Sequence, residues 1–113
     1  MTNMKGLIAV NEQIYNYIKR DEGINIVEIV NIDDDGILTY TGNKISLKDS
    51  ELYPRGIKLT HKQWRGLVEQ TLAEYHLQRE EFKKAVDDIM DKLFIREPVL
   101  EELDMLVFFY VNR

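Results

Sequence analysis

Residues 31–42, NIDDDGILTYTG, place acidic side chains and a glycine at the spacing of a calcium-binding loop. A loop of the EF-hand type takes oxygen ligands at its positions 1, 3 and 5, has glycine at position 6 and ends in a bidentate glutamate at position 12. The first four of these positions are filled by Asn31, Asp33, Asp35 and Gly36. Position 12 is Gly42, so the ligand that contributes two oxygens is absent.

The same stretch fits a hairpin turn better than a metal site. Its flanks are rich in β-branched residues, whereas a calcium loop of this kind joins two helices. The side chains of Asp33, Asp34 and Asp35 can accept hydrogen bonds from nearby amides. Gly36 can adopt the left-handed backbone conformation that a tight turn needs. We therefore predict a turn and no metal site, with weak attraction of a cation by Asp33 and Asp35 as the alternative.

A second candidate is a basic segment that lies between two acidic ones. Residues 52–65 contain four cationic side chains and no carboxylate, and we name these four the basic island: Arg55, Lys58, Lys62 and Arg65. Residues 1–51 carry five basic and nine acidic side chains (net −4), and residues 66–113 carry six basic and eleven acidic (net −5). The whole chain, at a net charge of −5, is expected to repel nucleic acid at long range.

The basic island enters a predicted helix, which permits two interpretations. Backbone amides at a helix N-terminus can hold a phosphate group together with Lys and Arg side chains. The same cations can instead form the solvated face of an amphipathic helix and neutralise nearby carboxylates. Trp64 falls on the apolar stripe of that helix, so we expect it in the core. A nucleic-acid-associated role through the basic island is therefore our alternative hypothesis.

Residue types that serve in catalysis are few and scattered. His61 and His76 are the only histidines, and the chain has no cysteine. The sequence contains no nucleophile elbow, phosphate-binding loop or dinucleotide-binding fingerprint. The carboxylates of Asp87–Asp88 and Glu101–Glu102 are adjacent on predicted helices and point in different directions. We therefore predict no enzymatic activity and no cofactor.

The C-terminal segment 98–113, PVLEELDMLVFFYVNR, has more apolar residues than one helix face can bury. One side suffices to dock a helix: Val99, Leu100, Leu103, Leu106, Val107, Tyr110 and Val111. Met105, Phe108 and Phe109 project from the other side. Soluble monomers usually avoid an exposed apolar patch of this kind.

Three outcomes would account for Met105, Phe108 and Phe109. The segment can be buried on both sides within the fold, it can end as a strand added to the sheet, or a partner can cover it. The third outcome gives our leading hypothesis, a non-catalytic protein-protein interaction or regulatory module. Its partner would be another protein or a second copy of the chain, as in a homodimer.

Residues 1–23 are predicted to form an N-terminal helix. Four apolar residues recur at helical spacing: Leu7, Val10, Ile14 and Ile18. The run Asp-Glu-Gly at 21–23 supplies a stop. In an alternative interpretation, a strand at residues 6–10 precedes a shorter helix that Asn11 caps.

Residues 24–56 are predicted to form a three-stranded antiparallel β-meander. The segments INIVEIVNI, GILTYT and KISLK are dense in β-branched residues. Their connections, at 33–36 and 42–43, are short and consist of residues that tolerate a positive φ.

Residues 57–113 are predicted to form three helices. Thr60 and Gln63 have the spacing of a capping box at the start of the first. The apolar stripe of the first helix is Trp64, Leu67, Val68, Leu72 (or Thr71) and Tyr75, and that of the second is Phe82, Val86, Ile89 and Leu93. Pro98 suits the first turn of the third helix.

These elements predict one small α+β domain over residues 1–113, in the order α-β-β-β-α-α-α. No apolar run approaches the roughly 18 residues of a membrane span, and no leader opens the chain, so we expect no membrane association. A chain without cysteine fits the reducing cytoplasm. The abundance of Ile, Lys, Asn and Asp is typical of a bacterial or phage protein from an AT-rich genome.

Overall fold

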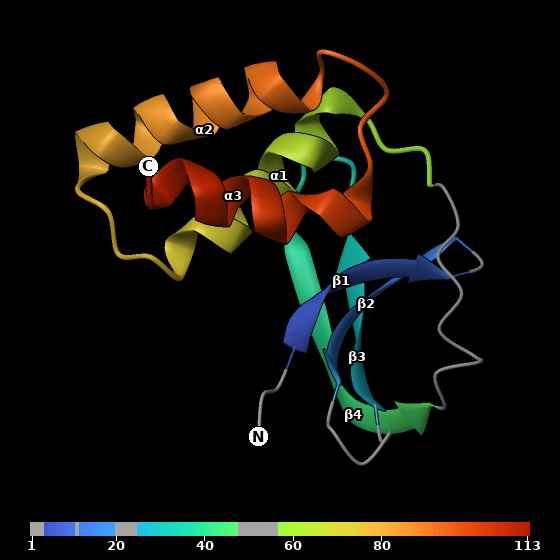
Figure 1. The fold of residues 1–113 in the computed structure, drawn as a ribbon. Helices are drawn as coiled ribbons and strands as arrows, with labels where there is room; N and C mark the ends of the chain where they lie inside the picture. Colours follow the sequence, from blue (N-terminus) through green and yellow to red (C-terminus); the bar gives the residue numbers. More distant parts are fainter. Residues whose placement is uncertain (1–3, 11, 20–24, 48–56) are drawn as a thin grey trace.

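The chain folds into four strands followed by helices. The computed structural model describes residues 4–10, 12–19, 25–47 and 57–113. The elements, in chain order, are β1 (Met4–Val10), β2 (Gln13–Lys19), β3 (Asn25–Ile32), β4 (Leu38–Leu47), α1 (His61–Ala73), α2 (Arg79–Leu93), the 3₁₀ helix η2 (Leu100–Glu102) and α3 (Leu103–Val111). This is an α+β fold, as the sequence predicted, in which the helices gather at one end of a curved sheet (Figure 1).

The sheet is antiparallel, and its strands lie in chain order, β1-β2-β3-β4. The pairing includes Val10 with Gln13, Ile14 with Val30 and Ile32 with Leu38. Each strand therefore pairs with its neighbour in the sequence through a short connection, which is the arrangement of a meander.

The predicted N-terminal helix is wrong, because residues 4–10 and 13–19 form the paired strands β1 and β2. The expected strand at residues 6–10 is present, but a second strand follows it in place of a helix. The apolar residues have helix-like spacing because the hairpin connection changes which alternate positions face the core, from odd-numbered residues in β1 to even-numbered residues in β2. Ala9 and Ile14, five positions apart, are direct cross-strand partners and are both buried. The β-branched and aromatic residues of β2 also favour a strand.

The predicted turn at residues 42–43 is wrong as well, because β4 is one strand of ten residues. Pairing along β3 and β4 passes from Val30↔Tyr40 to Glu28↔Lys44, so β4 contains extra residues between two paired positions. This irregularity is a β-bulge, and a glycine inside a strand commonly marks one. The glycine at position 42 thus accommodates a bulge within a strand and does not end it.

The helical half agrees with the sequence. The Gln63 amide donates to the Thr60 hydroxyl oxygen (3.1 Å), and the Thr60 amide donates to Gln63 Oε1 (2.9 Å), which confirms the capping box. The helical residues after Pro98 begin only at Leu100, so the proline precedes the 3₁₀ turn. Within the described ranges, none of the helices has the length and apolar content that a membrane crossing requires.

One apolar core joins the sheet to the helices. The strands contribute Leu7, Ala9, Ile14 and Val30. The helices contribute Trp64, Leu67, Val68, Leu72, Ala85, Val86, Ile89, Met90, Leu93, Leu100, Leu103, Val107 and Tyr110. Both predicted helical stripes reach this core, although Tyr75 and Phe82 at its margin are only half-buried.

The β3–β4 turn contacts α1 backbone to backbone. Gly36 has a φ of +84°, and a Cβ there would lie 2.4 Å from the carbonyl oxygen of Lys62. A Cβ on Gly66 would lie 1.9 Å from the carbonyl oxygen of Gly36. Both separations are too short for any side chain, so two glycines allow the sheet and the first helix to touch directly.

Substitution of Gly66 by alanine should therefore destabilise the protein. A Gly→Ala change inside a helix normally stabilises it by about 0.5–1 kcal/mol. Here the added methyl group would push the turn away from α1, and we expect a loss of about 1–3 kcal/mol. Urea unfolding with linear extrapolation measures the free energy, and Gln70→Ala, at an exposed position of the same helix, is the control. A more stable Gly66→Ala variant would contradict the observed contact.

Candidate interaction surface

The helix α3 is held in place on one side by the core. Leu103 and Val107 are fully buried, and Tyr110 is nearly so. The Leu7 amide of β1 donates to Asp104 Oδ2 (3.1 Å), and the Tyr110 hydroxyl donates to Asp88 of α2. These contacts bind α3 to α2 and to the first strand (Figure 1).

The other side of α3 is apolar and exposed. The exposed fraction of the residue is 63% for Met105, 50% for Phe108 and 64% for Phe109. The two phenyl rings lie 5.9 Å apart in an edge-to-face arrangement. We name these three residues the α3 stripe. The segment is thus a helix, neither enclosed on both sides nor added to the sheet, and partner binding stays a prediction.

The two ends of the α3 stripe differ in charge. Glu101 and Glu102 lie in η2, just before the start of α3. Burial raises the pKa of the Glu101 carboxyl, and the negative charge of Glu102 raises it further. Burial likewise raises the pKa of the Tyr17 hydroxyl on β2, and the charges of Asp104 and Glu101 raise it further. A partly buried acidic group thus lies between the start of the helix and the sheet.

At the C-terminal end of α3, polar groups complete the helix. The Asn112 side-chain amide donates to the Phe108 carbonyl (2.9 Å). The Arg113 guanidinium lies 4.1 Å from the centre of the Tyr110 ring, and its Nη2 donates to the Tyr110 hydroxyl (3.4 Å). Lys92 Nζ lies 5.5 Å from the centre of the same ring. This end of the α3 stripe is cationic, which suits a helix C-terminus.

Three residues of the basic island lie in the described part of the chain, and two of them are paired with carboxylates. Arg55 lies outside the described residues. Lys62 Nζ lies 3.5 Å from Asp35 Oδ1, at the surface. Arg65 lies 3.1 Å from a carboxylate oxygen of Asp87. These surface ion pairs add little stability, but they place carboxylates where a phosphate would have to bind.

Two further residues near the basic island have other surroundings. Trp64 is buried, as expected, and packs edge-on to Phe94 with ring centres 6.5 Å apart. It therefore offers no surface on which a base could stack. His61 lies 5.2 Å from the Phe94 ring, and Lys58 is exposed at the edge of a groove described below.

The acidic segment is a turn, as predicted. Asp33 Oδ1 accepts hydrogen bonds from the amides of Asp35 and Ile37, both at 2.9 Å. The Asp33 carbonyl accepts from the Gly36 amide (3.0 Å) and from Gln63 Nε2 (3.2 Å). Across the described segments, no three His, Cys, Asp or Glu side chains are grouped so that they could hold a metal ion.

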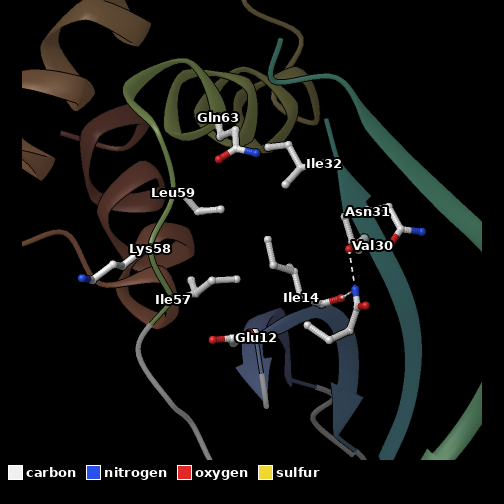
Figure 2. Close-up of a pocket in the computed structure, with 10 residues that line it drawn as sticks. Glu12, Ile14, Val30, Asn31, Ile32, Ile57, Lys58, Leu59 and Gln63 are labelled. Carbon is white, nitrogen blue, oxygen red and sulfur yellow. Dashed lines mark hydrogen bonds between the residues drawn. The ribbon is translucent and has the colours of Figure 1, made fainter. Parts of the chain in front are cut away.

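Sequence reasoning missed a groove of about 710 Å³ at the end of the sheet. It lies between the β1–β2 connection, the end of β3 and the segment that enters α1 (Figure 2). Its lining is Glu12, Gln13, Ile14, Val30, Asn31, Ile32, Ile57, Lys58, Leu59 and Gln63. The one sequence signal was the alternation Ile57-Lys58-Leu59, which is typical of an extended segment with one apolar side.

The raised pKa of Glu101 gives a pH-dependent prediction. Below its usual value of 4.5 the carboxyl is protonated in both the folded and the unfolded chain, so burial costs nothing. As the pH rises through the folded-state pKa, the charged form is disfavoured only in the folded protein, and stability falls. Glu101→Gln should therefore melt at a higher temperature than the wild type at neutral pH and at the same temperature below pH 4.5. Glu97→Gln, at an exposed position outside η2, is the control, and an equal gain at both pH values would refute the argument.

Comparison with known proteins adds no identification. No protein-family model matches the chain, and no curated protein or solved structure matches it either. What the protein does must therefore be argued from the surfaces described above.

Proposed function

We propose that this chain is a small, non-catalytic protein-interaction module of the cytoplasm that buries the α3 stripe against a second copy of itself. The observation that carries the proposal is the exposure of Met105, Phe108 and Phe109 on a helix whose opposite side is fixed in the core. Aromatic residues and methionine are enriched in the centres of protein-protein interfaces. The cytoplasmic assignment rests on the cysteine-free composition.

The α3 stripe suits the centre of an interface because it is already ordered. Leu103, Val107 and Tyr110 fix the helix, so little conformational entropy is lost when a partner docks. Three side chains alone cover less than the roughly 800 Å² that each partner buries in a standard interface. The exposed polar residues Glu102 and Asn112 would therefore form part of the rim.

The charges at the two ends of α3 favour an antiparallel arrangement of the two copies. A two-fold axis through the α3 stripe would bring Glu102 of one copy near Arg113 of the other. It would also oppose the two helix dipoles. A parallel arrangement would instead bring Glu102 near Glu102 and Arg113 near Arg113. The same surface patch on both copies thus offers both apolar area and complementary charge.

Light scattering coupled to size-exclusion chromatography tests the pairing. The wild type should shift from monomer to dimer mass as its concentration rises. Phe108→Ser combined with Phe109→Ser should remain monomeric, because the substitution removes most of the apolar contact area. The matched control is Ile95→Ser, which changes an 80% exposed isoleucine outside the α3 stripe and should dimerise like the wild type. Identical monomer masses for the wild type and the double variant at every concentration would contradict the proposal.

Charge reversal tests the antiparallel geometry separately. Glu102→Arg and Arg113→Glu should each weaken dimerisation, by roughly 0.2–1 kcal/mol as exposed ion pairs do. The chain with both substitutions should regain wild-type dimerisation, since the opposite charges again face each other. Sedimentation equilibrium gives the three dissociation constants. Additive weakening in the double variant would show that the two residues do not meet across the interface.

A further inference from the structure

The groove at the end of the sheet borders the part of β3 that continues past its described pairing with β2. The pairing of β2 with β3 ends at Ile14↔Val30, so Asn31 and Ile32 extend beyond the paired part of β2. The Asp33 amide donates across the hairpin to the Ile37 carbonyl (3.1 Å), so the main chain of Asp33 faces β4. Because main-chain groups alternate along a strand, those of Ile32 face the other way, toward the groove.

The opposite wall of the groove is also extended chain. Residues 57–59 form neither helix nor strand. Ile57 and Leu59 point into the groove and Lys58 points away from it (Figure 2). Ile14 and Val30, both buried, form the apolar floor. Two extended walls with aliphatic side chains at alternate positions thus enclose the space.

Polar groups stand at one end of this space. Gln13 Nε2 donates to the carbonyls of Val30 (2.9 Å) and Ile14 (3.1 Å), where β2 begins. Glu12, in the β1–β2 connection, is exposed and lines the groove. Its φ of 66° is left-handed, which costs a residue with a Cβ about 1 kcal/mol and would cost glycine almost nothing. The groove therefore has a carboxylate at a position where the backbone conformation alone favours glycine.

We propose that this groove binds a short extended peptide that adds as a strand beside the end of β3. Main-chain groups of the peptide would pair with those of Ile32, as in other cases of strand addition. Its aliphatic side chains, at alternate positions, would pack against Ile57 and Leu59, and a Lys or Arg would face Glu12. The volume of about 710 Å³ lies within the range of ligand-binding pockets. This site is separate from the α3 stripe and does not depend on dimerisation.

The peptide character of the occupant follows from the shape of the walls. A compact small molecule would use one convergent set of polar groups, whereas here the aliphatic residues of the two walls occupy alternate positions, as in extended chain: Val30 and Ile32, and Ile57 and Leu59. Glu12 carries the negative charge of the described lining, whereas Lys58 points away from the groove (Figure 2), and the protein as a whole is acidic. A cationic peptide is thus favoured both at the groove and at long range.

A nuclear magnetic resonance titration tests the site with a defined probe. The acetylated, amidated pentapeptide KVSVS is added up to millimolar concentration to the ¹⁵N-labelled full chain. We expect amide shifts concentrated at Glu12–Ile14, Asn31–Ile32 and Ile57–Leu59. The peptide EVSVS should bind roughly fivefold more weakly because its charge is repelled. The peptide KVVSS, which has the same composition without alternation, should also bind more weakly.

A charge reversal in the protein makes the test specific. Glu12→Lys should prefer EVSVS over KVSVS, whereas the control Glu80→Lys, at an exposed position on α2, should keep the wild-type preference. The spectra of the two variants without peptide show whether each retains the fold. No shifts at the groove, shifts centred on α3, or a preference unchanged by Glu12→Lys would overturn the proposal. Groove shifts that depend on protein concentration without peptide would also overturn it, since a second copy would then be the occupant.

Discussion

The direct contact between Gly36 and Gly66 determines how the two halves of the molecule meet. No side chain separates the β3–β4 turn from α1 at this point, and the Asp33 carbonyl accepts a hydrogen bond from Gln63 of the same helix. Because the turn is fixed on α1, the apolar face of the sheet lies over the helices and the core closes. The same contact places the end of β3 opposite the segment that leads into α1, and the groove is the space left between them.

Helix α3 depends on that arrangement and then adds a surface of its own. Its inner side needs the core that α1 and α2 form, and Asp104 needs the Leu7 amide of the first strand. With its inner residues so fixed, the outer residues Met105, Phe108 and Phe109 are held together in one place. The geometry of the apolar patch is therefore a property of the whole fold.

The sequence predicted those features that local chemistry determines. The capping box needs only Thr60 and Gln63, and the acidic turn needs only Asp33 and nearby amides, so both could be inferred correctly. The N-terminal hairpin and the bulge in β4 could not, because apolar spacing does not distinguish two residues on one hairpin face, such as Leu7 and Ile14, from two residues on a helix face. The surplus of apolar residues in the C-terminal segment left three outcomes open for the α3 stripe, and only the structure shows that it is exposed. The groove brings together segments far apart in the chain, and no local pattern specifies that.

The hydrogen bond from Leu7 to Asp104 has a consequence for how the chain folds. It joins residues 97 positions apart, whereas the strands pair only with their neighbours in the sequence. Local pairings of that kind form early, and contacts that close a long loop carry the greater entropic cost. Docking of α3 on β1 is thus expected among the last events of folding. The chain would acquire its apolar patch in final geometry only when its first strand and its last helix have docked, so the fixed arrangement of that patch would report on complete folding.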